Sequence, residues 1–396
     1  MELDVYCTTL EKMLSSIKQQ HKYIVGVPYE RDIDEQCVGL TPQAVAILSN
    51  AGFEVKVETD AGLASGFSNL DYLEAGASIV GQKEALNVDI VFKILPLKLD
   101  EIEYLKHGAI VFSIACNRMQ TKEYFLKLIE KKATAIGYDS LQGKKGNLII
   151  MDAICKIIGN ACPLIAGEYF SSPHKNKGHI IGSVAGIPPT EIVFLGATKI
   201  TEIAAKIFLA MDASVKIFDK SITRLNDIKQ SLGVPIYTSM LYPDTLQNAL
   251  ATADLVVADS FSNIDGEYFI TEAQVKTMKK GSLIIDVGVA RGSNVETSHP
   301  TTFCEPIFIK HGVAHYCVPN ISARFPKTSS LAFSNILLPI LYEISKGFSF
   351  HDLLRLHKSL RTGVYIYKGI ITSESIASKY GWNAKKIDIL LDFPTS

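Results

Sequence analysis

Short runs rich in β-branched residues alternate with amphipathic helical runs along the first part of the chain. The apolar runs begin with "YIVGVP" and recur as "FEVKVET", "VDIVFKIL", "AIVFSIA" and "TAIGYD", with helical stretches such as "TPQAVAILSNAG" between them. Strands that alternate with helices in this way predict a parallel α/β sheet from Lys22 to Tyr138. Thr41 and Pro42 predict a helix start, and Gly52 marks its end.

The same alternation resumes in the second half. A Gly- and Lys-rich break, "LQGKKGN", precedes a segment of helical periodicity from Leu148 to Tyr169. Beyond it, "VPIYTS", "ADLVVADS", "SLIIDVGV" and "IFIKHGVAHYCVPN" continue the alternation of strand and helix, which predicts a second α/β domain. The remaining tail is predicted as amphipathic helices. It is too short to form a core of its own, so we expect it to pack on an earlier domain.

The second domain opens with "IVFLGATKITEIAAKIFLAMDASVKIFDKS", which reads as strand, turn, helix and a strand ending in an acid. A dinucleotide-binding turn uses three glycines for the tight turn, for close approach of the diphosphate and for packing of the helix on the strand. Gly196 holds the first place, while Thr198 and Thr201 hold the second and third. Asp219 stands where a carboxylate accepts bonds from ribose hydroxyls, which favours NAD over NADP. The predicted cofactor-binding residues are Gly196, Ala197, Thr198, Lys199, Thr201 and Asp219.

Two interpretations of this turn stay open. The branched side chain of Thr198 lies where phosphate oxygens come close, so nucleotide affinity should fall, by a few kcal/mol if the crowding resembles that of other overpacked sites. Thr198 and Lys199 nevertheless offer a hydroxyl and an ammonium group at a helix N-terminus, which is an anion-binding feature. The alternative is an ordinary βαβ unit without a ligand.

Composition excludes several classes of protein. The 396 residues include 40 Lys and Arg against 41 Asp and Glu, so the near-zero balance predicts neither a nucleic acid nor a membrane surface as partner. Seven cysteines without a C-x-x-C pair predict free thiols in a reducing compartment. The N-terminal stretch reads as a polar helical extension, and apolar runs such as "LAFSNILLPILYEI" are shorter than a membrane span. We expect a cytoplasmic protein, and His174 and His311 lack the spacing of a metal site.

Long stretches of the sequence resemble, in the same order, those of a known protein family. "GVPYERDIDEQCVGLTPQAVAILSNAGFEVKVETDAGLASGFSNLDYLEAGASIV", "PPTEIVFLGA" and "GVYIYKGIITSESIASKYG" closely resemble alanine dehydrogenases and the alpha subunit of pyridine nucleotide transhydrogenase. The resemblance implies two Rossmann-like, doubly wound parallel-sheet α/β domains with a cleft between them. It also implies NAD, a small amino or keto acid substrate and a homo-oligomer, dimeric or hexameric. Residues 1–147 and 326–396 would form the substrate domain and 148–325 the nucleotide domain.

The family's chemical groups carry over unevenly. The family lysine is retained as Lys93, which is therefore the predicted catalytic residue, although a solvated surface lysine is the ordinary alternative. The arginine that clamps the substrate carboxylate is replaced by Cys37, and the histidine acid/base by Cys116. Ala290 replaces the aspartate, and Asn320 is a further pocket position by family match. The arginines that could replace the clamp from another side are Arg31, Arg118, Arg291 and Arg324.

Other side chains keep two interpretations each. Cys37 and Cys116 either form a nucleophile or redox pair or fill space in the core. His315 and Tyr316 follow a predicted strand and either face the cleft or pack in the core.

Three functions therefore remain open. The first is an NAD(P)-linked oxidoreductase of the alanine dehydrogenase type, with chemistry on L-alanine doubtful because Cys37, Cys116 and Ala290 replace family groups. The second is an oxidoreductase for a different amino or imino acid, or a transhydrogenase alpha-like subunit. The third is a non-catalytic, ligand-sensing or structural oligomer on the same fold.

Overall fold

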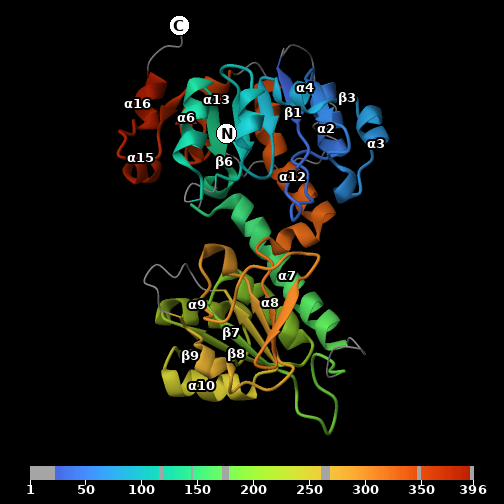
Figure 1. Ribbon diagram of the computed structural model, residues 1–396, viewed down its shortest axis with the longest axis vertical. Helices are drawn as coiled ribbons and strands as arrows, with labels where there is room; N and C mark the ends of the chain where they lie inside the picture. The colour runs from blue at the N-terminus through green and yellow to red at the C-terminus, as the bar shows by residue number, and fades with distance from the viewer. Residues whose placement is uncertain are drawn as a thin grey trace. The chain divides into compact units, whose positions relative to one another are not determined.

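The computed structural model describes residues 23–115, 119–143, 146–171, 178–259, 268–345 and 349–392. The chain divides into two compact units (Figure 1). Unit 1 combines the residues up to Ala153 with those from Phe325 onward, and unit 2 is Ile154–Arg324. The blue and cyan N-terminal part and the red C-terminal part thus share one unit in Figure 1. The predicted polar N-terminal helix lies outside the described residues.

Unit 1 is built on one eight-stranded sheet with the order β15-β14-β6-β5-β4-β1-β2-β3. The strands from β6 to β3 are parallel, and the order reverses direction at β1, as in a doubly wound fold. The central strands are buried because helices cover both faces, which explains their unbroken apolar runs. The strands are β1 (Ile24–Val27), β2 (Glu54–Glu58), β3 (Ser78–Val80), β4 (Ile90–Phe92), β5 (Ile110–Ser113), β6 (Thr134–Gly137), β14 (Val364–Tyr367) and β15 (Ile370–Ile371).

The C-terminal tail corrects the prediction of helices alone. The strands β14 and β15 form an antiparallel hairpin, and β14 also pairs antiparallel with β6 at the edge of the parallel sheet. The β-branched and aromatic sequence "VYIY", buried at all four positions, and the Lys368–Gly369 turn, at φ of 47° and 79°, explain the hairpin. Sequence inspection missed the hairpin although β14, with four residues, is as long as β1; only β15, with two residues, is shorter than the recognised strands.

Local signals in unit 1 are confirmed with one change. Helix α2 begins at Pro42 after the N-cap Thr41, and Gly52, at φ 91°, lies just beyond the C-cap Ala51. The Thr41 side chain does not cap the helix. Its hydroxyl lies 3.3 Å from Ser334 Oγ on α12, so this residue connects distant parts of the chain. The helices of unit 1 are α2 (Pro42–Asn50), α3 (Asn69–Glu74), α4 (Gln82–Leu86), α5 (Leu99–Glu103), α6 (Lys122–Glu130), α12 (Pro326–Ser345), α13 (Phe350–Leu356), α14 (Lys358–Arg361), α15 (Glu374–Tyr380) and α16 (Ile387–Asp392), with short 3-10 turns η2 (Leu63–Ser65) and η3 (Tyr138–Ser140).

Unit 2 repeats the architecture with a seven-stranded sheet of order β12-β13-β11-β10-β7-β8-β9. All neighbours are parallel except β12 and β13. These two strands form an antiparallel hairpin, so the predicted alternation of strand and helix in "IFIKHGVAHYCVPN" is wrong. The chain reverses direction there because His311 and Gly312 form a tight turn, with φ of 55° and 80°. The strands are β7 (Glu191–Leu195), β8 (Ser214–Asp219), β9 (Tyr237–Met240), β10 (Leu255–Ala258), β11 (Leu283–Asp286), β12 (Ile307–Lys310) and β13 (Val313–Tyr316).

The long helix α7 (Ile149–Ser171) confirms the predicted helical segment, and the boundary between the units falls within it. By length and composition alone it could cross a membrane, contrary to the prediction that every apolar stretch is too short. Core helices of soluble proteins share this property, and α7 buries small residues such as Ala161 and Cys162. A Cβ at Gly159 would lie 2.7 Å from Ile203, so this glycine lets α7 pack closely on α8. The other helices of unit 2 are α8 (Lys199–Ala210), α9 (Ile222–Leu232), α10 (Pro243–Thr252) and α11 (Glu272–Val275), with 3-10 turns η4 (Val289–Arg291) and η5 (Ile321–Arg324).

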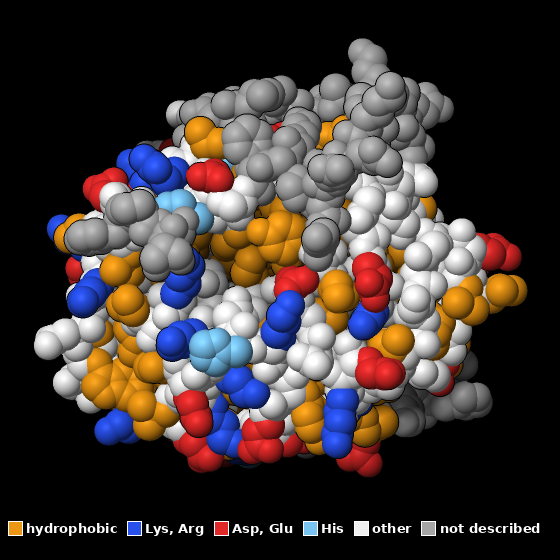
Figure 2. Space-filling view, turned by 90° about the horizontal axis from the view of Figure 1, so that it is seen from above, with side chains coloured by type: hydrophobic (Ala, Val, Ile, Leu, Met, Phe, Trp, Pro, Cys, Tyr) orange, Lys and Arg blue, Asp and Glu red, His pale blue; other side chains and the backbone are white. Residues whose placement is uncertain are grey.

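Charges are distributed over the surface without a field of a single sign on the face viewed in Figure 2, where blue basic and red acidic side chains are interspersed. This agrees with the near-even counts of 40 basic and 41 acidic residues.

Candidate functional site

The turn between β7 and α8 keeps its first glycine for a steric reason. Gly196 has φ of 101°, and a Cβ on it would lie 2.0 Å from the carbonyl oxygen of Asp259. Asp259 directly follows β10, the strand that pairs with β7. Only glycine allows the two strand ends to approach this closely.

The two threonines replace the missing glycines with hydrogen bonds. Thr198 is the N-cap of α8, and its hydroxyl accepts a bond from the Thr201 N–H at 3.2 Å. The same hydroxyl donates to the carboxylate of Asp259. The Thr201 hydroxyl is buried and donates to the Gly196 carbonyl at 2.6 Å. The turn is therefore fixed by contacts within the protein, and Asp259 lies beside the position expected for a diphosphate.

Asp219, at the end of β8, is only 2% exposed and has several partners. Its Oδ2 accepts from the Ala197 N–H at 2.7 Å, which ties the acid to the turn. Its Oδ1 accepts from the Ser221 N–H at 2.7 Å and from Arg224 Nη2 at 2.6 Å. The carboxylate that would bind a ribose is thus oriented, and Arg224 partly neutralises it.

Lys199 lies at the first position of α8, but its ammonium pairs with Glu202 at 2.8 Å. Burial alone would raise the pKa of Glu202. Hydrogen bonds from Lys199 and Lys206 outweigh the effect of burial and lower the pKa of Glu202 to about 2, so this side chain is charged. The Lys199 ammonium is therefore paired with Glu202 on the same helix.

A third acid, Asp286, ends β11 and is 1% exposed. Burial is the main cause of its raised pKa, and the charge of Asp259 contributes. Carboxylates thus follow three strands at one edge of the sheet. Sequence analysis missed Asp259, although the acid directly after the buried run "LVVA" was a usable signal. Ala290 lies in η4, four residues after Asp286, and is exposed. Its methyl side chain has no ionisable or hydrogen-bonding group.

Unit 1 places a buried ion pair at the carboxyl edge of its sheet. Lys93 directly follows β4 and Glu30 lies three residues beyond β1, which is the neighbouring parallel strand. Lys93 Nζ lies 2.6 Å from Glu30 Oε2 and 3.8 Å from Glu101 Oε2, and only 2% of the lysine is exposed. The Ile94 N–H donates to Glu30 Oε1 at 2.6 Å. Burial raises the pKa of Glu30 from 4.5 to about 7, although Lys93 opposes the change.

Two of the arginines proposed as alternative clamps, one in each unit, form ion pairs. Arg31 forms an ion pair with Glu58, at the end of β2, and lies 3.4 Å from Glu101 Oε1. The Arg31 guanidinium is therefore not free to bind a substrate carboxylate in this structure. Arg324 in unit 2 pairs with Glu168, and its Nη1 lies 3.4 Å from the Tyr316 hydroxyl.

Cys37, which the resemblance places at the family arginine position, is a buried thiol. It is 2% exposed, and its N–H donates to Glu35 Oε1 at 2.8 Å. Burial, and then the charge of Glu35, raise the pKa of the thiol far above its ordinary value, so this side chain is a poor nucleophile. Cys116 and Arg118 lie outside the described residues.

Two buried hydroxyls at the same edge have no hydrogen-bond partner among the described residues: Ser113, the last residue of β5, and Tyr138, directly after β6. Burial, followed by the charge of Glu30, raises the pKa of Tyr138 well above its ordinary value. Buried polar groups are normally hydrogen-bonded, so Ser113 and Tyr138 offer hydroxyls at this edge that no described residue uses.

The remaining predicted positions lie in unit 2. Asn320 precedes η5 and accepts a hydrogen bond from the Ser322 hydroxyl at 2.9 Å. His315 is fully buried, stacks on Phe308 and shares a 2.7 Å hydrogen bond with Thr297, which places it in the core. Within the part of the chain that the structure describes, no group of three His, Cys, Asp or Glu residues is placed to hold a metal ion.

Comparison with known proteins assigns both parts of the chain. Residues 26–157 match the alanine dehydrogenase/PNT N-terminal domain, and residues 162–374 match the alanine dehydrogenase/PNT C-terminal domain. The chain is 31% identical over 368 residues to alanine dehydrogenase 2 of Staphylococcus aureus strain USA300, covering 92% of this chain and 98% of that protein.

Solved structures of this family have the same fold. An L-alanine dehydrogenase superposes with a TM-score of 0.82 at 27% identity, covering 90% of this chain and 99% of the other. A transhydrogenase from Sinorhizobium meliloti shares the fold, with a TM-score of 0.74 at 20% identity over 89% of this chain and 99% of that one. The α/β fold of two mostly parallel sheets and the oxidoreductase kind follow from these matches. The chain belongs to the alanine dehydrogenase/pyridine nucleotide transhydrogenase family.

Proposed function

We propose that this protein is an NAD-linked oxidoreductase that acts on an amine or imine other than L-alanine. The observation that carries the proposal is the carboxyl edge of the unit 1 sheet. There the lysine at the family position is paired with Glu30, and the buried hydroxyls of Ser113 and Tyr138 have no hydrogen-bond partner among the described residues.

The charges at this edge argue against a small anionic substrate. Arg31 and Lys93 are each bound to carboxylates, the exposed Lys98 donates to the Arg31 carbonyl at 3.3 Å, and the predicted clamp position is the uncharged Cys37. A substrate carboxylate is best held by a bidentate arginine, and loss of such a contact costs about 2 to 5 kcal/mol. Glu30, with a pKa of about 7, is suited to exchange a proton with an amine near neutral pH.

The nucleotide turn supports NAD in part. Asp219 is buried, oriented and tied to the turn through Ala197, which fits the adenosine ribose. Thr198 and Asp259 fit the diphosphate poorly, because a branched side chain and a carboxylate lie beside its position. When bound, NAD would supply the hydride acceptor, and we expect its affinity to be weak.

The test is a screen of amines, imines and amino acids with NAD, and of the matching carbonyl compounds with ammonia and NADH, followed by NADH absorbance. Turnover of an uncharged or cationic substrate well above turnover of L-alanine supports the proposal. Tyr138→Phe should then lower the rate, whereas Tyr124→Phe, a buried tyrosine whose hydroxyl lies 3.3 Å from Tyr365, should not. L-alanine as the best substrate, or no turnover with any compound, contradicts the proposal.

A second candidate is a non-catalytic, ligand-sensing or structural member of the family. The contact between Thr198 and Asp259 favours it, since both groups oppose a diphosphate. Calorimetric titration with NAD and NADH separates the two: absence of binding at millimolar nucleotide supports the second candidate.

We also propose a soluble, cytoplasmic homo-oligomer, on the basis of family membership. Light scattering coupled to size-exclusion chromatography measures the mass directly, and a monomer over the working range of concentration would contradict this proposal.

A further inference from the structure

A pocket opens in unit 1 at the amino edge of the sheet, opposite the edge that carries Lys93. Its lining comes from the starts of parallel strands and from the end of β14, which runs antiparallel and therefore ends at the same edge. Asp89 directly precedes β4 and Lys93 directly follows it, so the two edges are about 13 Å apart along this strand. The pocket is separate from the candidate site.

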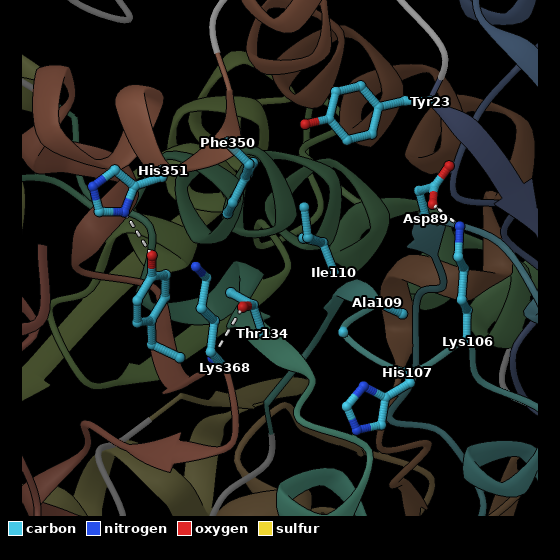
Figure 3. Close-up of a pocket in the computed structure, with 12 residues that line it drawn as sticks. Tyr23, Asp89, Lys106, His107, Ala109, Ile110, Thr134, Phe350, His351 and Lys368 are labelled. Carbon is cyan, nitrogen blue, oxygen red and sulfur yellow. Dashed lines mark hydrogen bonds and ion pairs between the residues drawn. The ribbon is translucent and has the colours of Figure 1, made fainter. Parts of the chain in front are cut away.

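The pocket holds about 190 Å³ and has an apolar floor with a cationic rim (Figure 3). Ala109, Ile110 and Phe350 are buried at its base. One liquid water occupies about 30 Å³, so the space fits about six waters or a compact ion with one or two waters. A dinucleotide needs a much larger cavity.

The ionisable lining is mostly basic. Lys106, Lys368, His107 and His351 face a single carboxylate, that of Asp89. Lys106 Nζ pairs with Asp89 Oδ1 at 2.5 Å, and His351 Nδ1 lies 2.7 Å from the Tyr367 hydroxyl (Figure 3). The Lys368 ammonium and the His107 ring have no ion pair or hydrogen bond with a described residue, and both side chains belong to exposed residues. Apart from a contact of the Lys368 ammonium with the Tyr367 ring, at 5.7 Å from its centroid, the rim therefore offers positive charge and hydrogen-bond donors without a described acceptor.

The backbone of Lys368 adds an independent observation. It adopts φ of 47° in the tight turn between β14 and β15, a conformation that favours glycine, asparagine or aspartate. Its N–H donates to Thr134 Oγ1 at 3.1 Å, which fixes the residue over the pocket. A lysine is disfavoured here relative to glycine, and residues in such conformations cluster at binding sites.

We propose that this pocket binds a compact phosphate-type oxyanion, either free phosphate or the phosphate group of a small monoester. The anion would lie on the apolar floor between Lys368 and His107, with the Lys106 ammonium within the same rim. The volume of about 190 Å³ limits the size of the ligand, and the basic rim supplies its charge complement.

Isothermal titration calorimetry on the full chain, in a phosphate-free buffer of low salt, tests the proposal with inorganic phosphate and with glycerol phosphate. We expect a dissociation constant of about 1 mM or below for one of them; tighter binding of glycerol phosphate identifies a monoester as the ligand and equal or weaker binding identifies free phosphate. Lys368→Asn and His107→Gln should each weaken binding by about tenfold. Asparagine tolerates the positive φ, so the Lys368→Asn protein should keep or raise its melting temperature.

Lys229→Asn, a matched change of an exposed lysine in unit 2, should bind the anion like the original protein. Two results would overturn the proposal. One is no heat of binding with either anion at about 20 mM, well above the expected dissociation constant. The other is equal binding by the Lys368→Asn, His107→Gln and original proteins, which would place the anion elsewhere, such as at the N-terminus of α8.

Discussion

Replacing Asp259 by asparagine should strengthen NAD binding, because it removes a buried negative charge beside the expected diphosphate. The Asp259 carboxylate accepts a hydrogen bond from Thr198, which holds the second glycine position of the turn. A hydrogen bond plus a van der Waals contact separates the carboxylate from a diphosphate there by about 6 Å. At an effective dielectric constant of about 20, two unit charges at that distance repel by about 3 kcal/mol, and salt reduces this to about half.

The expected gain is therefore about tenfold to a hundredfold in NAD affinity. Thr198→Gly should gain less, because the carboxylate remains and loses a hydrogen bond worth about 1.5 to 3 kcal/mol. The double variant should bind at least as tightly as Asp259→Asn. Calorimetric titration measures each dissociation constant, and urea unfolding measures the accompanying change in stability.

Asp227→Asn provides the matched control, since Asp227 is an exposed acid on α9 with the same formal charge. Its substitution should leave NAD affinity within about twofold. If Asp259→Asn binds NAD no better than the original protein while remaining folded, the carboxylate does not face the diphosphate and the reasoning fails.

Three further predictions concern unit 1. Lys93→Met should lower the free energy of unfolding, measured in urea, by about 3 to 5 kcal/mol, because Glu30 loses its buried partner. The double variant Lys93→Met, Glu30→Gln should recover most of that loss, and purely additive losses would show that the two side chains do not stabilise each other. Because the pKa of Glu30 is raised from 4.5 when unfolded to about 7 when folded, the native protein binds an extra proton between these values. Stability should fall by up to about 3 kcal/mol as the pH rises through that window, and Glu30→Gln should remove this component; an unchanged slope in the variant would contradict it. Iodoacetamide should label exposed Cys304 rapidly and Cys37 only on unfolding, as read by peptide mass spectrometry, since burial raises the Cys37 pKa; early labelling of Cys37 would show that the thiol is reactive.

Local features of the chain were predictable from the sequence. The Thr41, Pro42 and Gly52 signals mark α2 because helix ends depend on nearby residues. Gly196 and Asp219 were recognisable because the turn and the acid belong to one contiguous βαβ unit. The hairpin at the C-terminal tail escaped recognition, since the two residues of β15 carry no periodicity and β14 therefore lacked a visible partner strand.

The pairing of site residues was not predictable in the same way. Glu30 meets Lys93 because β1 and β4 are neighbours in the sheet, although 63 residues separate them in the sequence. Asp259 meets Thr198 because β10 pairs with β7, across 61 residues. Strand order, which is a property of the whole fold, decides these contacts.

The connection between Thr41 and Ser334 has a consequence for biosynthesis. Unit 1 needs both ends of the chain: the Val38 N–H donates to Ser330 across 292 residues, and β14 pairs with β6. While the ribosome is still making the later part, the edge of β6 remains uncovered, and uncovered strand edges recruit other chains. Unit 2, whose residues are contiguous, can complete its sheet first. The nascent chain should therefore depend on chaperones until its last strands emerge.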